Sequence, residues 1–161
     1  MADTYVQSST EFTLSDPDGA RTILQKLYDI QERYDDGLLE KDNTILSADE
    51  KEFLEYYKDS TGDISSLTIA GNILFVCVEL NADYDVLGYA LNRILQSEPN
   101  ETTWVVPYAV TCSRMIVDAF GGGVLVVTVN GWGVWGAEDL ARSIMDERGD
   151  YLIENFVPRK K

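Results

Sequence analysis

A glycine-rich hexapeptide at residues 131–136, Gly-Trp-Gly-Val-Trp-Gly, has the spacing G-x-G-x-x-G of a dinucleotide-binding turn. It follows a β-branched run and precedes a segment with helical periodicity. In such a turn the glycines let the backbone approach a pyrophosphate, which lies at the N-terminus of the following helix. Nucleotide binding is therefore the first chemistry that these residue types suggest.

The surroundings of this hexapeptide argue against a nucleotide site. The preceding run, 124–129, is predicted to form a hairpin closed by the glycines at 121–123, whereas the dinucleotide motif belongs to parallel sheets. Glu138 and Asp139 begin the predicted helix that follows, where they would repel a phosphate. Glu154 alone supports the motif, because it lies near the offset at which an acid contacts the ribose.

We therefore expect the glycines to form a tight turn between a strand and a helix. In this interpretation, Trp132 and Trp135 close one end of the core. The alternative is that the two rings form an aromatic patch facing a partner, since Trp and Tyr are favoured anchors at interfaces. No cofactor is expected in either case.

Residues for other enzyme chemistry are scarce. The chain has no histidine, which removes the commonest general base and the imidazole metal ligands. Cys77 and Cys112 are far apart in the sequence, each within an apolar run, and do not make a zinc site. We expect two buried thiols, and a disulfide between neighbouring strands is the alternative.

Paired carboxylates are the remaining candidates for catalysis. The pairs are Asp35 with Asp36 and Asp83 with Asp85, and the segment 35–42 lacks the spacing of an EF-hand loop. Asp83 and Asp85 are better explained as residues that begin a helix. A carboxylate-dependent hydrolase is the third hypothesis for function. The prediction is a protein that is not an enzyme and that binds no metal.

Charge is the most informative bulk property. The 161 residues include 28 acidic and 13 basic ones, for a formal net charge of −15. Residues 1–65 carry 16 acids and 6 bases, and residues 66–161 carry 12 acids and 7 bases, so the excess is concentrated in the N-terminal part. We expect no direct binding to nucleic acid or to an anionic membrane, because both need clustered lysine and arginine.

The acids of segment 29–63 form the main candidate for a binding surface. Glu52, Glu55 and Asp59 have the spacing i, i+3, i+7, which predicts a row on one helix face at about 5–6 Å between neighbours. Such a row resembles the phosphates of a nucleic-acid strand and would fit a basic groove. A purely solubilising surface is the alternative. The predicted partner-binding residues are Asp35, Asp36, Glu40, Asp42, Asp49, Glu52, Glu55, Asp59, Trp132 and Trp135.

Four helices are predicted from periodicity and from their start signals. Asp16 followed by Pro17 begins a helix that ends near residue 34. A capping box at 47–50 opens a strongly acidic helix that extends to about residue 59, and 35–44 is a polar connection. Asp83 begins a third helix that stops near residue 96, and a fourth is expected at 137–148.

Short β-rich runs alternate with these helices. A hairpin is predicted from 66–69 and 73–80, which flank a glycine-containing turn. Pro107 predicts an edge position or a bulge for its strand. The other predicted strands are 11–14, 104–111, 114–120, 124–129 and, as a candidate, 151–157.

These elements predict an α+β fold. We expect a single antiparallel sheet of about five or six strands, with three to four helices packed mainly on one face. At this length the chain is expected to form a single domain, 1–161. Within it, 1–65 is the acidic helical part, 66–157 the hairpin–helix–sheet–helix part, and 158–161 a short basic tail.

Small size, strong acidity and the absence of histidine are features also found among phage-encoded inhibitors of host defence, such as anti-restriction and anti-CRISPR proteins. This similarity is one of composition, so no residue role follows from it. The leading hypothesis is a non-enzymatic acidic module that binds a protein with a basic surface, as a mimic of nucleic acid. The alternative is an assembly protein that oligomerises, for example as a homodimer, through a Trp/Tyr-rich β surface.

The expected location is the cytoplasm, or the host cytoplasm if the protein is encoded by a phage. No apolar stretch reaches the length of about 18–20 residues that a membrane span needs. The first residues also lack the pattern of a signal peptide.

Overall fold

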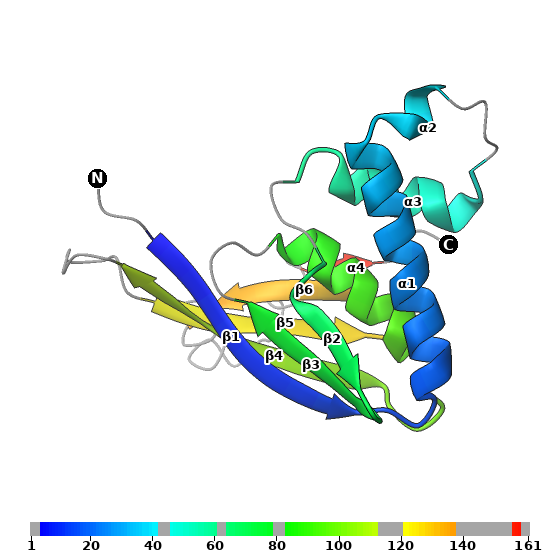
Figure 1. The fold of residues 1–161 in the computed structure, drawn as a ribbon. Helices are drawn as coiled ribbons and strands as arrows, with labels where there is room; N and C mark the ends of the chain where they lie inside the picture. The colour runs from blue at the N-terminus through cyan, green and yellow to red at the C-terminus, as the bar shows by residue number, and fades with distance from the viewer. Residues whose placement is uncertain are drawn as a thin grey trace.

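The computed structural model describes residues 4–41, 46–60, 64–78, 83–112, 121–137 and 156–158. Antiparallel strands lie on one side of the molecule, and helices lie against them on the other (Figure 1). The helices are α1 (Pro17–Asp35), α2 (Leu38–Lys41), α3 (Ala48–Tyr57) and α4 (Tyr84–Leu95). The strands are β1 (Thr4–Thr13), β2 (Leu67–Ala70), β3 (Ile73–Val78), β4 (Thr103–Cys112), β5 (Gly121–Thr128), β6 (Gly131–Gly136) and β7 (Phe156–Pro158).

The three long helices begin at the caps that the sequence predicts. The Asp16 carboxylate accepts a hydrogen bond from the Gly19 N–H at 3.0 Å. Ser47 and Glu50 form the predicted capping box, and Asp83 caps α4. These caps satisfy N–H groups that a helix leaves without intrahelical partners, so they fix the starts of the helices locally.

The strands do not form the single sheet of five or six strands that the sequence predicts. They are hydrogen-bonded in the order β2-β3-β1-β4-β5-β6-β7, and every neighbouring pair is antiparallel. Residues 8–13 of β1 pair with β3 and complete a three-stranded sheet with β2. A second sheet is built on the three strands β4, β5 and β6. The single-sheet prediction is therefore wrong, and the broader α+β assignment holds.

The two sheets meet where β1 changes partner. Its residues 4–7 pair with β4, with the ladder ending at Gln7 and Ala109, and its next residues pair with β3. Pro107 lies just beyond the end of this ladder, two residues before Ala109 on β4, and supplies no N–H to extend it. The Ser8 hydroxyl donates instead to the Pro107 carbonyl at 2.6 Å. Pro107 therefore lies at a local edge, which agrees with the prediction for this residue.

Several strand boundaries differ from the predicted ones. β1 is ten residues long, where a short strand at 11–14 was expected. The glycines at 121–123 begin β5 and pair with β4, so they are not the turn of a hairpin. The first hairpin is confirmed, with β2 and β3 joined at Gly71, whose φ is 61°. The predicted strand 114–120 and all but the first residue of the predicted helix 137–148 lie outside the described residues.

The helices pack over the sheets and enclose the core. α4 lies against β5 and β6, and α1 packs against α4. Strand residues alternate between this core and the outer face, so Leu74 and Val76 are buried while Phe75 is 37% exposed. The largest fully buried side chains include Trp132, Tyr89, Phe53, Ile30, Ile64, Leu67, Leu74, Leu91 and Leu125.

A buried carboxylate connects the loop after α4 to the start of α1. Glu98, which follows α4, is only 4% exposed. Its two carboxylate oxygens accept hydrogen bonds from the backbone N–H groups of Ser15, at 2.6 Å, and Asp16, at 3.2 Å. Glu98 therefore fixes the loop after α4 against the connection between β1 and α1.

Candidate functional site

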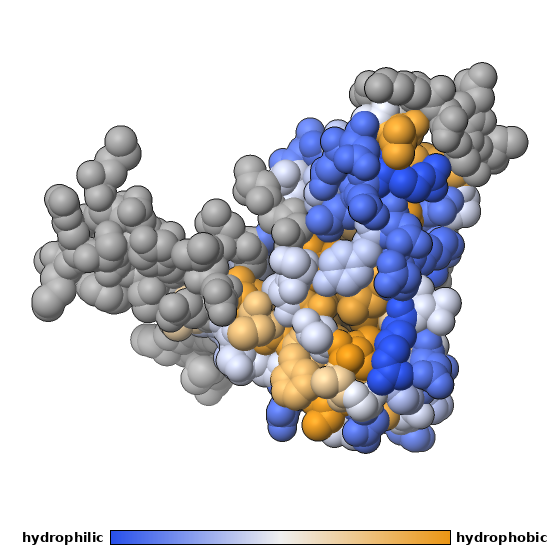
Figure 2. Space-filling model, in the orientation of Figure 1, coloured by the Kyte–Doolittle hydropathy of each residue, from blue (hydrophilic) through white to orange (hydrophobic). Residues whose placement is uncertain are grey.

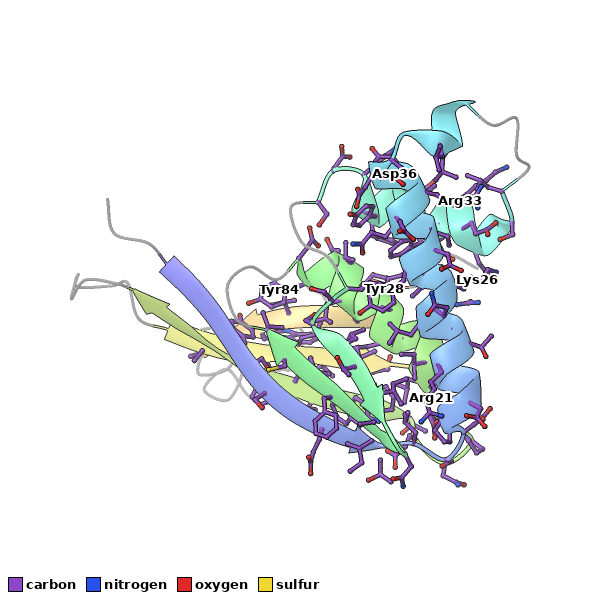
Figure 3. The ribbon with its side chains drawn as sticks, viewed as in Figure 1. Arg21, Lys26, Tyr28, Arg33, Asp36 and Tyr84 are labelled. Atoms are coloured by element: carbon purple, nitrogen blue, oxygen red, sulfur yellow. The ribbon has the colours of Figure 1, made fainter. Side chains whose placement is uncertain are left out.

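Exposed carboxylates gather on the second half of α1, on α3 and in the turns that follow these helices. We name this region the acidic helical surface. Its exposed acids are Asp29, Glu32, Asp35, Asp36, Glu55 and Asp59. In Figure 2 hydrophilic side chains predominate at the same end of the molecule, beside a few apolar ones. In Figure 3, Asp36 lies near the C-terminus of α1, with Arg33 beside it.

Aromatic packing holds α3 against α1 and so sets the shape of this surface. The Tyr57 ring stacks on Phe53, with ring centroids 5.6 Å apart, and meets the edge of Tyr34 at 5.7 Å. The Tyr57 hydroxyl donates to the Asp35 carboxylate, with distances of 2.8 and 3.0 Å to its two oxygens. Asp35 therefore has a structural role as well as an exposed charge.

The capping box at the start of α3 also fixes a charge. Hydrogen bonds from the Ser47 backbone and hydroxyl, together with nearby Lys26 and Arg33, lower the pKa of the Glu50 carboxyl. A lowered pKa in the folded state means that the ionised carboxylate stabilises the fold. This contribution is present above the ordinary Glu pKa and is lost as the pH falls through the lowered value.

A second aromatic group, the aromatic cluster, consists of Tyr56, Tyr89 and Trp132. The Trp132 ring lies 5.2 Å from Tyr56 and 6.1 Å from Tyr89. Its indole N–H donates to the Asp85 carboxylate at 3.1 Å. The cluster thus joins α3, α4 and β6 beneath the acidic helical surface.

Carboxylates surround Tyr56, the partly exposed member of this cluster. Burial raises the pKa of the Tyr56 hydroxyl, and the negative charges of Glu52, Asp85 and Glu55 raise it further. The phenol therefore stays protonated at neutral pH. Any contribution that it makes to stability is present below the ordinary tyrosine pKa and is lost as the pH rises through the raised pKa. Chemically, this edge of the acidic helical surface favours cations.

One of the predicted site acids, Asp49, is paired with a basic residue, Arg93. Arg93 forms a 2.7 Å ion pair with Asp49, whose side chain is 45% exposed. The Asp49 carbonyl accepts a hydrogen bond from the Tyr89 hydroxyl at 3.0 Å. Asp49 therefore fastens the start of α3 to α4, and its charge is partly neutralised.

The structure brings most of the predicted acids to one end of the molecule but does not form the predicted row. α3 ends at Tyr57, so Asp59 lies beyond the helix that carries Glu52 and Glu55. The expectation of three acids on one helical face is therefore wrong for Asp59. Asp42 and the side chain of Glu40 lie outside the described residues.

The two tryptophans predicted as site residues are both buried. Trp132 is 1% exposed and Trp135 is 5% exposed, so neither presents a ring to a partner in this structure. The glycine hexapeptide is the strand β6, paired with β5 and β7, and not a tight turn before a helix. These glycines are paired within a strand, whereas a dinucleotide motif places its glycines in the turn after a strand, and the lack of nucleotide binding stays a prediction.

Glycines in this region allow close packing within the sheet. A Cβ at Gly123 would lie 2.0 Å from the Trp135 carbonyl oxygen and 2.6 Å from the Tyr108 hydroxyl. Gly131 begins β6 with φ of 152°, a conformation that other residues rarely adopt. Glycine at these positions therefore lets neighbouring strands and a tyrosine ring pack closely. This packing is sufficient to explain why glycines are frequent here.

Replacing Gly88 by alanine tests the packing of Trp132. In most helix interiors this change stabilises by about 1 kcal/mol, because glycine is a poor helix former. At Gly88, however, the new Cβ would lie 2.3 Å from Cδ1 of the Trp132 ring. We expect a destabilisation of about 1–3 kcal/mol instead, measured by urea unfolding.

The same replacement in a Trp132→Leu background serves as the control for Gly88. A smaller side chain removes the clash, so the alanine should then be neutral or stabilising. A stabilising effect of Gly88→Ala in the unmodified chain would contradict the observed packing of Trp132 on α4.

The other candidates for catalysis have structural explanations. Asp83 accepts hydrogen bonds from the backbone N–H groups of Asp85 and Val86 at the start of α4. Within the described ranges, no group of three or more Cys, Asp or Glu side chains is placed to hold a metal ion. Cys77 is a free, exposed thiol, so the expectation that it is buried is wrong, and the Cys112 side chain lies outside the described part.

The aromatic cluster and Asp85 were not identified as a site from the sequence. The sequence explains Asp85 as a residue that begins a helix. The signal for both is their three-dimensional arrangement, because the ring that Asp85 contacts is 47 residues away in the chain.

Comparisons with known proteins give no relative: no family model, curated protein or solved structure matches this chain. None of the helices in the described ranges is both long and apolar enough to cross a membrane.

Proposed function

We propose that this protein is a non-enzymatic module whose acidic helical surface binds a basic surface of another protein. The observation that carries the proposal is the concentration of exposed carboxylates on α1 and α3, at the end of the molecule away from the sheets. Opposite charges across an interface speed association and select the partner. The partner's chemistry is therefore a groove or patch rich in lysine and arginine.

The rigidity of the surface supports this proposal. The exposed acids are carried by helices with defined caps, and aromatic rings hold α3 on α1. Because the helices that carry the carboxylates are held in place before binding, little backbone freedom is lost on association. A purely solubilising surface has no need of such order.

We propose further that the partner is a protein that binds nucleic acid. Such proteins neutralise phosphates with clustered lysine and arginine, and an ordered carboxylate surface offers the same cations an alternative ligand. In this proposal the module competes with nucleic acid for the basic groove, and so acts as an inhibitor.

Reversing two charges on this surface tests the proposal. Asp36 and Asp59 are exposed and follow the C-termini of α1 and α3, where lysine is compatible with the helix dipoles. We expect Asp36→Lys with Asp59→Lys to change stability by no more than about 0.5 kcal/mol per site. Association with a partner captured from cell lysate should slow by about tenfold or more, as measured by surface plasmon resonance.

A matched variant distinguishes a binding site at a defined position from a general effect of net charge. Glu11→Lys with Glu101→Lys changes the net charge by the same amount at exposed positions on β1 and before β4. We expect this variant to associate nearly as fast as the unmodified protein. We also expect duplex DNA to displace the partner from this variant and from the unmodified protein. Equal loss in the two double variants would contradict a site on α1 and α3, and failure of DNA to compete would contradict mimicry.

The outer face of the sheets favours self-association as a second candidate. Phe75 and Val105 are 37% and 47% exposed there, whereas the tryptophans are buried. A second copy of the chain packed on this face would bury both side chains. The mass of the protein in solution, measured by light scattering alongside the capture experiment, distinguishes a homodimer from a monomer.

A further inference from the structure

A groove separates α1 from the edge strand β2. It has a volume of about 680 Å³, within the range of ligand-binding pockets. Figure 2 shows apolar side chains at the bottom of a hollow beside the hydrophilic flank of α1. The residues that line the groove are Arg21, Thr22, Leu24, Gln25, Lys26, Tyr28, Asp29 and Ile69.

The outward edge of β2 faces this groove. The Cys77 N–H donates to the Ser66 carbonyl at 2.8 Å, and β2 then pairs with β3 from Leu67 to Ala70. In an antiparallel ladder, alternate residues direct both backbone groups toward the partner strand. Since Ser66 points toward β3, residues 67 and 69 direct their N–H and C=O groups outward, toward α1.

Side chains of α1 occupy this edge on both sides of Ile69. The Tyr28 hydroxyl lies 2.9 Å from the Ile64 carbonyl oxygen and 3.0 Å from that of Leu67. The Arg21 guanidinium donates to the Gly71 carbonyl. Covering of this kind is common at exposed sheet edges, where free backbone groups otherwise pair with other chains.

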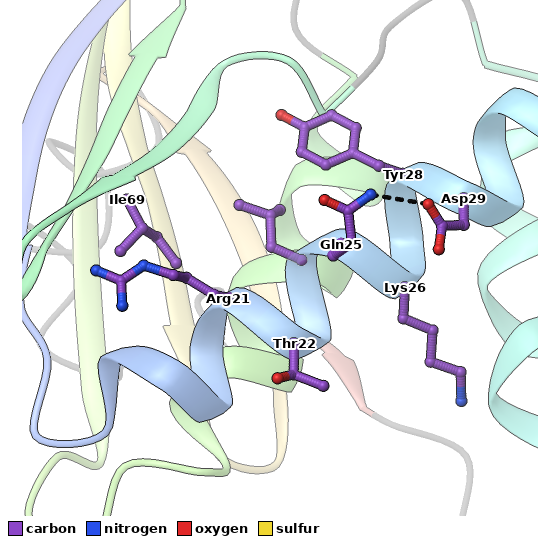
Figure 4. A pocket seen from close by; sticks show the side chains of 8 residues that line it. Arg21, Thr22, Gln25, Lys26, Tyr28, Asp29 and Ile69 are labelled. Carbon is purple, nitrogen blue, oxygen red and sulfur yellow. Dashed lines mark hydrogen bonds between the residues drawn. The ribbon is translucent and has the colours of Figure 1, made fainter.

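Ile69 is the exception along this short edge. Neither its outward N–H nor its outward C=O has a hydrogen-bond partner among the residues that the structure describes. Figure 4 shows the Ile69 side chain opposite Arg21, across the groove from Gln25 and Tyr28. Ile69 therefore presents one free backbone donor and one free backbone acceptor to the groove, whose apolar floor is formed by Leu24 and Ile69.

The charges at the rim, counted with Asp18 beside it, balance. Arg21 is paired with Asp18 at 2.6 Å, and Gln25 donates to Asp29 at 2.8 Å. Lys26 supplies a second positive charge, so two cations stand against two carboxylates. The rim thus offers no net attraction to an anion, which favours an uncharged ligand.

We propose that this groove binds an extended, uncharged peptide segment by strand addition at Ile69. One peptide residue donates its N–H to the Ile69 carbonyl and accepts from the Ile69 N–H, as in an antiparallel pair. Its side chain then lies on the same face as that of Ile69, over Leu24, so an apolar residue such as valine fits there. The groove shares Asp29 with the acidic helical surface, but the groups that bind the peptide, the Ile69 N–H and C=O, belong to β2.

The test uses a defined peptide, acetyl-Ser-Thr-Val-Thr-Ser-amide, and the same peptide with an N-methylated valine. Amide chemical shifts of isotope-labelled protein are followed up to millimolar peptide. We expect the largest shift at the Ile69 amide, together with slower hydrogen exchange there. The N-methylated peptide, which lacks the central donor, should bind at least about fivefold more weakly.

Two variants locate the interaction on the protein. Proline is tolerated where an edge-strand N–H faces away from the ladder, so Ile69→Pro should keep the fold and lose binding. Ile69→Val retains the N–H and should bind normally. Should Ile69→Pro not fold, the N-methylated peptide still decides the question.

Three results would overturn the proposal. The first is the absence of any shift at Ile69 at millimolar peptide, and the second is equal binding of the N-methylated peptide. The third is a shift at Ile69 that depends on protein concentration without peptide, because it would identify a second copy of the chain as the occupant.

Discussion

Replacing Trp132 by alanine is expected to destabilise the fold by about 3–5 kcal/mol, the range typical of large aromatic side chains in cores. The ring is 1% exposed and contacts two tyrosines of the aromatic cluster. It also lies against Gly88, so its loss would leave a cavity between α4 and β6. The free energy of unfolding in urea measures the effect.

Trp132→Phe provides the matched comparison. It retains an aromatic ring in the core but removes the indole N–H that donates to Asp85 at 3.1 Å. We expect a loss of about 1–3 kcal/mol, clearly smaller than that of the alanine variant. A loss below about 1 kcal/mol for alanine would show that Trp132 is not packed as described.

Glu98→Ala is expected to cost about 2–4 kcal/mol. Two backbone N–H groups, those of Ser15 and Asp16, would lose their carboxylate acceptor in a region where Glu98 is only 4% exposed. Thermal and urea unfolding measure the change. An intermediate result is expected for Glu98→Gln, because the amide retains one carbonyl oxygen as acceptor.

Glu101→Ala is the control for Glu98, since Glu101 is an exposed acid in the same connection between α4 and β4. Its stability should change by no more than about 0.5 kcal/mol. Equal effects of the two alanine variants would indicate that Glu98 does not connect the loop to the start of α1.

The glycine hexapeptide forms a strand and not the predicted tight turn, and this difference has a physical explanation. G-x-G-x-x-G fixes only the places where a Cβ is absent, and close packing in a sheet selects glycine as readily as a phosphate does. What decides between them is the neighbouring strand. Residues 123–128 pair with residues 131–136, so the segment became a strand through partners that local spacing does not reveal.

The acidic site was predictable in composition but not in geometry. The concentration of acids before residue 65 follows from counting, and Glu52 and Glu55 share a helix as predicted. That Asp35 accepts a hydrogen bond from Tyr57, and that Asp49 pairs with Arg93, depends on how α1, α3 and α4 pack together. These contacts determine which carboxylates remain available to a partner.

By itself, the sequence determined the starts of the long helices, the first hairpin and the uneven charge. Each of these depends on residues a few positions apart: Asp16 caps the N–H of Gly19, and Ser47 caps that of Glu50. Only the tertiary structure decided how β1 divides between two sheets, that Trp135 is buried, and that Ile69 keeps a free edge. These outcomes depend on which distant segments become neighbours, because strand pairing and burial are set by the whole chain and not by local preference.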